Sequence, residues 1–192
     1  MKFPFLIARK TRLSNLKGKV NIVSNEIKTG MIQIGLGDVP VFDRVKSRTV
    51  WNNAGTVIFK GSACIGHGSK IGCGGIITFG NNFQITAESM IICDHEINFG
   101  DDVLLSWQIQ IMDTDFHKVY YNDTLQNKKS AITIGNHTWI GSRSIINKGV
   151  TLGNNTIVAA GTVVTKSFTE SNSMIGGVPA KILRKYTKWE MK

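Results

Sequence analysis

Residues 134–169 read IGNHTW IGSRSI INKGVT LGNNTI VAAGTV VTKSFT, six consecutive hexads that begin at Ile134. The first position of each hexad is aliphatic, occupied by Ile134, Ile140, Ile146, Leu152, Val158 and Val164. The second position is mostly small and the fifth is mostly Thr, Ser or Val. An amphipathic helix would instead place apolar residues at i, i+3, i+4 and i+7. A period of six therefore indicates a repeat architecture built from strands.

The same phase continues upstream, where units begin at Phe59, Phe79 and Phe99, 20 residues apart, whereas Ile134 and Leu152 are 18 apart. Each unit is thus three hexads, with two extra residues at a corner in the early units. We expect one short strand per hexad and three strands per coil, with the aliphatic residues inward and Gly or Asn at corners. Coils stacked at about 4.8 Å would pair their backbone groups with the next coil. The sequence predicts an all-β parallel β-helix with a triangular cross-section.

One long break interrupts the repeat. Phe99 and Ile134 are 35 residues apart, 17 more than the 18 of one coil, and the extra residues lie in DTDFHKVYYNDTLQNKKSA, residues 113–131. A loop of this length inside a periodic fold is usually functional or disordered. It contains His117, one of four histidines in the chain, close to Asp113 and Asp115.

The segment from Ile134 to Phe168, followed by GGVPAKILR, resembles the hexapeptide-repeat acyltransferases, and its later part is similar to maltose, galactoside and capsular-polysaccharide O-acetyltransferases. The resemblance covers residues 57–185. It implies a left-handed β-helix, an exception to the usual right-handed crossover. It also implies acetyl-CoA as the acyl donor and a homotrimer with the active site between subunits.

By this resemblance, His117 is the general base that takes the proton of the acceptor. Imidazole titrates near neutral pH, and a carboxylate on its other nitrogen would fix the tautomer. Asp113 and Asp115 are the candidates for that second role, and the sequence leaves open which of them faces His117. The residue pattern alone also allows Asp115 and His117 to be ordinary loop residues that bond the backbone.

The resemblance also implies a coenzyme A site along the last coils. The matching positions are Trp139, Gly141, Ser142, Ala159, Ala160, Thr165, Lys166, Lys181 and Arg184. The first three would lie near the thioester, the alanines along the pantetheine arm, and the others toward the nucleotide. A backbone N–H of Gly141 or Ser142 could donate to the developing oxyanion. Subunit packing for Trp139 and plain solvent exposure for the basic residues remain alternatives.

A metal site is not expected. Zinc needs three or four ligands that converge within about 2.1 Å, and the four histidines fall at different offsets in their coils. The net charge of +10 favours an anionic partner. Because the basic residues gather at the two ends of the chain, in residues 9–19 and 181–192, rather than in a stripe with interleaved aromatics, we expect no nucleic acid. Weak contact of the basic N-terminus with an anionic membrane surface stays open.

The 192 residues suit one domain. We expect an irregular segment at 1–56 that could begin a first coil, the β-helix at 57–168, and a turn with a short amphipathic α-helix at 169–192. The sequence contains no run of about 18 uncharged apolar residues, the length that could span a bilayer. The N-terminus lacks a signal-peptide pattern, and Cys64, Cys73 and Cys93 show no CxxC pairing. The expected location is cytoplasmic.

Taken together, the sequence predicts an acetyl-CoA-dependent O-acetyltransferase that acts on a hydroxyl of a sugar or polysaccharide precursor, with a role in polysaccharide biosynthesis. One alternative is an N-acyltransferase acting on an aminosugar or an antibiotic. The other is a non-catalytic β-helix scaffold, which would have no need of the insertion at 113–131 or of His117.

Overall fold

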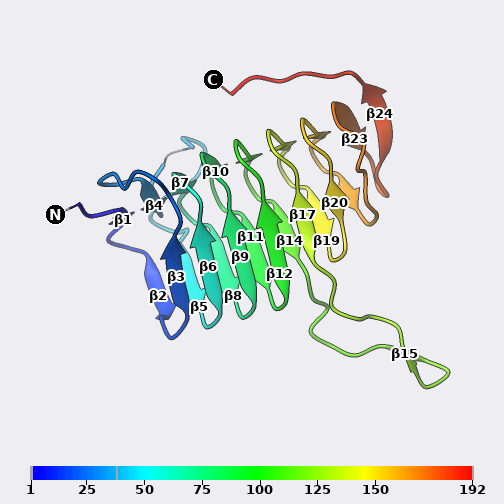
Figure 1. Cartoon of the computed structure of the whole chain (residues 1–192), viewed down its shortest axis with the longest axis horizontal. Coiled ribbons are helices and arrows are strands. Elements are labelled where there is room, and N and C mark those ends of the chain that lie inside the picture. Colours follow the sequence, from blue (N-terminus) through cyan, green and yellow to red (C-terminus); the bar gives the residue numbers. More distant parts are fainter. Residues whose placement is uncertain (1, 38, 192) are drawn as a thin grey trace.

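The computed structural model describes residues 2–37 and 39–191. The described chain is all-β, and its strands form a prism of three parallel sheets through which the chain passes in turn (Figure 1). The predicted left-handed parallel β-helix is confirmed. We name the sheets A, B and C, and the edges of the prism A–B, B–C and C–A by the sheets that meet there.

Sheet A runs in the order β1 (Phe5–Ile7), β4 (Ile32–Ile34), β7 (Ala63–Ile65), β10 (Phe83–Ile85), β13 (Leu104–Leu105), β18 (Trp139–Ile140), β21 (Ile157–Val158), β23 (Ser173–Gly176), β24 (Lys181–Lys185). Sheet B runs β2 (Arg12–Asn15), β5 (Val50–Asn53), β8 (Lys70–Cys73), β11 (Met90–Cys93), β14 (Gln110–Met112), β19 (Ile145–Asn147), β22 (Val163–Val164). Sheet C runs β3 (Lys19–Ile22), β6 (Thr56–Phe59), β9 (Ile76–Phe79), β12 (Glu96–Phe99), β17 (Ile132–Ile134), β20 (Thr151–Leu152).

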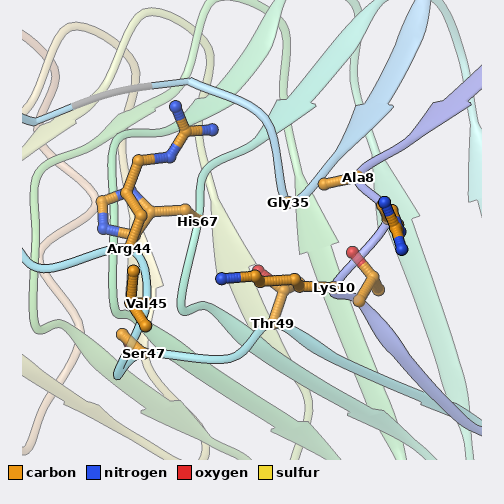
Figure 2. Close-up of a pocket in the computed structure, with 10 residues that line it drawn as sticks. Ala8, Lys10, Gly35, Arg44, Val45, Ser47, Thr49 and His67 are labelled. Atoms are coloured by element: carbon orange, nitrogen blue, oxygen red, sulfur yellow. The ribbon is translucent and has the colours of Figure 1, made fainter.

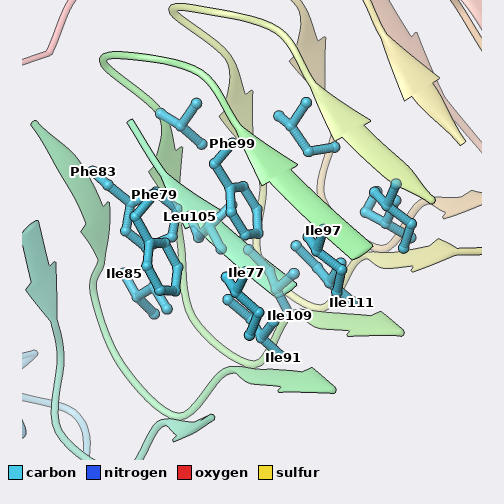
Figure 3. Close-up of a cluster of buried hydrophobic side chains, with 14 of the residues drawn as sticks. Ile77, Phe79, Phe83, Ile85, Ile91, Ile97, Phe99, Leu105, Ile109 and Ile111 are labelled. Atoms are coloured by element: carbon cyan, nitrogen blue, oxygen red, sulfur yellow. The ribbon is translucent and has the colours of Figure 1, made fainter. Parts of the chain in front are cut away.

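The core forms because each coil places its aliphatic or aromatic residue above the equivalent residue of the previous coil. In sheet C, Ile97 pairs with Ile77 on one side and Ile132 on the other, and all three are fully buried. Phe79 stacks on Phe99 with ring centroids 5.5 Å apart (Figure 3). Ladders of identical residues at the sheet spacing therefore fill the prism without large voids.

The fifth position of the hexads is small for a specific reason. Thr138, Thr156 and Thr162 are fully buried, and each donates its hydroxyl to the carbonyl three residues earlier at 2.6–2.8 Å. This bond satisfies a backbone acceptor at the corner of the coil and the hydroxyl itself. The fifth position therefore points inward, as the aliphatic first position does.

The prism begins earlier in the chain than the predicted boundary at residue 57. Strands β1, β2 and β3 pair in parallel with β4, β5 and β6, so two coils precede residue 60. The period is hidden there because 15 residues separate β4 from β5, whereas four separate β7 from β8, so the chain carries an inserted segment before β5. Part of this inserted segment folds over the A–B edge, where Phe42 meets His67 with ring centroids 6.1 Å apart.

The predicted C-terminal α-helix is wrong. Residues 181–185 form β24, which pairs antiparallel with β23, and β23 pairs in parallel with β21. The last coil leaves unpaired backbone groups along its edge, and a strand satisfies them whereas a helix would not. The tail then runs back across the coils (Figure 1), where Trp189 donates its indole N–H to the carbonyl of His137 at 2.9 Å and stacks on that imidazole.

The insertion leaves the prism at the B–C edge, between β14 and β17, and projects away from it (Figure 1). Its outer part is a small antiparallel hairpin, β15 (Tyr120–Tyr121) with β16 (Thr124–Leu125). Over residues 2–37 and 39–191 no helix reaches the length and apolar character that crossing a membrane requires.

Candidate active site

Asp113 fixes the base of the insertion. Its side chain is fully buried, and its carboxylate accepts three backbone N–H groups from the preceding coil: Asp94 at 2.7 Å, His95 at 2.9 Å and Glu96 at 2.8 Å. Both carboxylate oxygens are therefore engaged by the B–C corner one coil earlier. The insertion starts from a rigid point of the prism.

Asp115 anchors the next part of the loop. Its Oδ2 accepts a hydrogen bond from the Lys148 ammonium of the following coil and another from the Asn127 amide at 2.8 Å. The bond from Lys148 is the main cause that holds the pKa of Asp115 below its ordinary value, and the bond from Asn127 adds to it. Asn127 also donates to the carbonyl of His117 at 2.6 Å. One carboxylate thus joins both ends of the loop to the prism.

His117 lies at the exposed surface of this loop. Its backbone N–H donates to the carbonyl of Asp115 at 2.7 Å, whereas its imidazole forms no hydrogen bond with any residue that the structure describes. Asp113 and Asp115 have the other partners given above. The predicted orientation of the imidazole by one of these carboxylates is therefore not present in this geometry, and the catalytic role of all three residues stays a prediction.

The pocket beside His117 holds about 210 Å³ and is lined from both ends of the loop. Its walls include Thr114, Leu125 and four lysines, of which Lys129 pairs with Asp94 at 2.7 Å. That carboxylate raises the pKa of the Lys129 ammonium. The site can thus accept a polar molecule next to an imidazole whose two nitrogens are open to solvent or substrate.

The residues predicted to hold the thioester and the pantetheine arm gather at a different edge. Gly141, Ser142, Ala159 and Ala160 form the A–B corners of the last two complete coils, directly after β18 and β21. The N–H of Gly141 donates to the carbonyl of Val158 at 2.8 Å, so it is not free to bind an oxyanion.

The N–H groups of Ser142 and Ala160 meet no acceptor in the part of the chain that the structure describes. A side chain at Gly141 would place its Cβ 2.7 Å from the nitrogen of Ala160, so only glycine fits there. The two unpaired N–H groups lie on adjacent coils at a corner lined by small residues. They could donate to a thioester carbonyl and to the amide of a pantetheine arm.

Trp139 points outward from β18 and is 37% exposed. Its indole N–H donates to the Ser106 hydroxyl at 3.0 Å, and its ring lies 6.1 Å from that of Trp189. The indole N–H of Trp139 is therefore satisfied by Ser106 within the chain, and Trp189 of the tail covers part of the ring. Sequence reasoning could not find Ser106 or Trp189 here, because neither shares a motif with Trp139.

The predicted nucleotide residues do not form one cluster. Thr165 and Lys166 follow β22, and the Lys166 ammonium lies 5.6 Å above the ring of Phe168. Lys181 and Arg184 lie on β24, which extends sheet A. All four are exposed at the C-terminal end of the prism. Among residues 2–37 and 39–191, no three His, Cys, Asp or Glu side chains converge as they would around a metal ion.

Comparisons with known proteins agree with the repeat. Residues 131–166 match the model of the hexapeptide repeat of succinyl-transferase. An uncharacterized 24.8 kDa protein in the cps region of Klebsiella pneumoniae is 32% identical over 190 residues, 96% of this chain and 81% of that protein.

Two solved structures extend the comparison. The polySia-specific acetyltransferase NeuO is 23% identical, with a TM-score of 0.62 over 98% of this chain and 78% of that one, and shows the same fold. Galactoside acetyltransferase in complex with coenzyme A is 31% identical, with a TM-score of 0.51 over 58% of this chain and 56% of that one. Six consecutive hexads, three parallel sheets and these relatives together show that the chain belongs to the hexapeptide-repeat acyltransferases.

Proposed function

We propose that the chain transfers an acetyl group from acetyl-CoA to a hydroxyl of a sugar or of a polysaccharide precursor, with His117 as the base. The observation that carries this proposal is the anchored loop, which holds an imidazole that forms no hydrogen bond with the described residues, beside an open pocket. The likeness to galactoside acetyltransferase with coenzyme A supports acetyl-CoA as donor. A galactoside carries hydroxyls as its acceptor groups, which supports O-acetylation over N-acylation.

The proposed reaction is a direct transfer. His117 removes the proton of the acceptor hydroxyl as its oxygen attacks the thioester carbon. The carbonyl oxygen gains negative charge and accepts a hydrogen bond from the backbone N–H of Ser142. When the tetrahedral intermediate collapses, the carbon–sulfur bond breaks and coenzyme A leaves as a thiolate. The new ester carries the acetyl group, and the proton on His117 passes to the thiolate or to solvent.

We further propose that two copies of the chain build each site, as in a homotrimer. The loop with His117 leaves the B–C edge, whereas Ser142 and Ala160 occupy the A–B edge, and sheet B separates the two edges within one chain. The imidazole can meet the thioester when the B–C edge of one copy faces the A–B edge of another. A subunit contact of this kind would bring together the residues proposed for catalysis.

Complementation tests this arrangement. His117→Ala removes the base, and Ala160→Trp blocks the donor groove with an outward side chain, so each variant should be inactive alone. Unfolding and refolding the two variants together should restore a measurable fraction of thiol release, because mixed oligomers contain interfaces with both intact edges. If the mixture stays inactive while each variant still assembles, the site lies within one copy.

Release of thiol from acetyl-CoA with a panel of acceptors tests the chemistry. The panel needs a neutral galactoside, an acidic oligosaccharide and an aminosugar, with the acetylated product identified by mass spectrometry. We expect an acetyl ester on a hydroxyl. Acetylation of only the amine would favour the N-acyltransferase alternative, and turnover with none of the three would count against the proposal.

A further inference from the structure

A second pocket, whose lining residues Figure 2 shows, lies on the A–B edge near the N-terminal end of the prism, away from the loop of His117. It holds about 320 Å³ and is built from four separate parts of the chain: residues 8–11 after β1, Gly35 directly after β4, residues 44–49 before β5, and His67 after β7. None of these residues belongs to the proposed catalytic site.

The pocket is rich in cations. Arg9, Lys10, Arg44 and Arg48 line it or the adjoining hollow. Arg48 donates Nε to the carbonyl of Lys10 at 2.9 Å, which fixes the two segments together. None of the four cations forms an ion pair with the residues that the structure describes. The nearby Asp43 is engaged by the N–H of Val45 at 2.8 Å. Unneutralised positive charge at a hollow attracts an anion.

The wall of the pocket contains polar groups that lack partners. His67 is 3% exposed, and neither of its ring nitrogens forms a hydrogen bond with a described residue; the hydroxyl of Thr11 is also unpaired. Buried polar groups are nearly always hydrogen-bonded, and leaving them unpaired costs free energy. A neutral imidazole offers one donor and one acceptor. A ligand with oxygen atoms in this pocket would pair with the cations and lie against the wall that holds the unpaired groups.

The position of the pocket relates it to the proposed catalytic site. His67 follows β7 and Ser142 follows β18, on the same edge and three strand steps apart in sheet A. At about 4.8 Å per step, the separation along the prism is about 14 Å. Trp107 lies between them, after β13, with an indole that is 36% exposed and 6.4 Å from the ring of Phe42. An exposed aromatic face of this kind offers a stacking surface with a polar handle.

We propose that this pocket binds the anionic group of an acidic acceptor glycan that lies along the A–B edge, across Trp107, with the reacting hydroxyl beside Ser142. The anion is the carboxylate or the phosphate of a sugar residue, and no bond is made or broken in the pocket. This inference rests on the proposed O-acetyl transfer, and it adds that the acceptor is an acidic glycan of more than one sugar residue.

Binding is measured by calorimetry on the full chain with three probes: a trimer of galacturonic acid, neutral galactotriose and a galactotriose that carries one phosphate. We expect at least one charged probe to bind about tenfold more tightly than the neutral one, with an affinity that falls as salt rises. Comparison of the two charged probes distinguishes a carboxylate site from a phosphate site. Equal affinity for all three probes would overturn the proposal.

The double variant Arg9→Gln/Arg44→Gln removes two exposed cations, so the fold should not change. It should bind the preferred charged probe about tenfold more weakly, with no change for galactotriose. Lys60→Gln is the matched control, because it removes an exposed lysine after β6, at the C–A edge. If the double variant and the control bind the charged probe equally well, the pocket is not the anion site.

His67→Leu separates binding from packing. Replacing an unpaired buried imidazole by an apolar side chain should leave the melting temperature unchanged or raise it. The same change should lower the affinity for the charged probe. Unchanged binding would contradict the inference. In turnover, both sets of variants should raise KM for the acidic acceptor and leave kcat unchanged. If no acceptor releases thiol but the binding differences hold, O-acetyl transfer fails and the anion site stands.

Discussion

Replacement of Asp113 by alanine should destabilise the whole prism rather than act on catalysis alone. The carboxylate is fully buried and accepts the N–H groups of Asp94, His95 and Glu96 at 2.7–2.9 Å. Alanine supplies no acceptor, so three backbone donors at the B–C corner would lose their partners. The start of the insertion would lose its attachment to the preceding coil at the same time.

The magnitude follows from these three bonds. A hydrogen bond to a charged group contributes about 1.5–3 kcal/mol, and leaving a buried donor unpaired costs about 1–3 kcal/mol. Because the three donors share one acceptor and water can enter after truncation, the effects do not add. We expect Asp113→Ala to lower the free energy of unfolding by about 3–5 kcal/mol. For a chain of this size that corresponds to a fall of about 10 °C in Tm.

Urea unfolding at fixed protein concentration measures the change, with Asp101→Ala as the matched control. Asp101 is exposed at the C–A edge and accepts one N–H, from Asn81 at 2.7 Å. Its loss should cost only about 0.5–1.5 kcal/mol. If Asp113→Ala unfolds at the same urea concentration as the wild type, the carboxylate does not hold the corner. A stable variant that has lost only turnover would instead favour a direct catalytic role.

Three further changes probe the loop, the tail and the core. Because Lys148 holds the pKa of Asp115 below its ordinary value, their ion pair is complete above about pH 4 and is lost as the pH falls through the lowered pKa. NMR titration should show a higher pKa for Asp115 in Lys148→Met than in the wild type, and an unchanged pKa would contradict the assignment. Trp189→Ala should remove the stack on His137 and weaken the attachment of the tail to the coils by about 1–2 kcal/mol. The backbone amides of residues 186–191 should then exchange faster, and unchanged exchange would mean that the stack does not hold the tail. Phe79→Ala should lower the free energy of unfolding by about 3–5 kcal/mol, measured by urea unfolding. A decrease of less than about 1 kcal/mol would show that the stacked phenylalanine rings are loosely packed.

The regular part of the fold was predictable because one residue in six carries the signal. The aliphatic residues from Ile134 to Val164 and the phenylalanines at 59, 79 and 99 point inward, and their spacing sets the length of a coil. The first two coils were harder to predict, since the inserted segment before Val50 shifts the phase. The apolar pattern of KILRK suits a helix or a strand equally, and the open edge of the last coil selects the strand.

The site was only partly predictable. The break in the period located the loop of His117, because an insertion in a strict repeat is visible without any structure. Sequence proximity suggested that Asp113 and Asp115 face the imidazole, but their partners come from neighbouring coils and from the far end of the loop. Such contacts depend on stacking and on the course of the loop. The pocket of His67 was missed for the same reason, since its walls come from three coils.

The most direct test of the account is the turnover of His117→Ala with acetyl-CoA and an acceptor that the wild-type chain acetylates. The side chain is exposed and forms no protein hydrogen bond within the described residues, so the variant should fold and bind acetyl-CoA as the wild type does. We predict that kcat falls by about 10²- to 10⁴-fold, the usual cost of losing a general base. A variant that keeps more than about a tenth of wild-type turnover would contradict the assignment of His117 as the base.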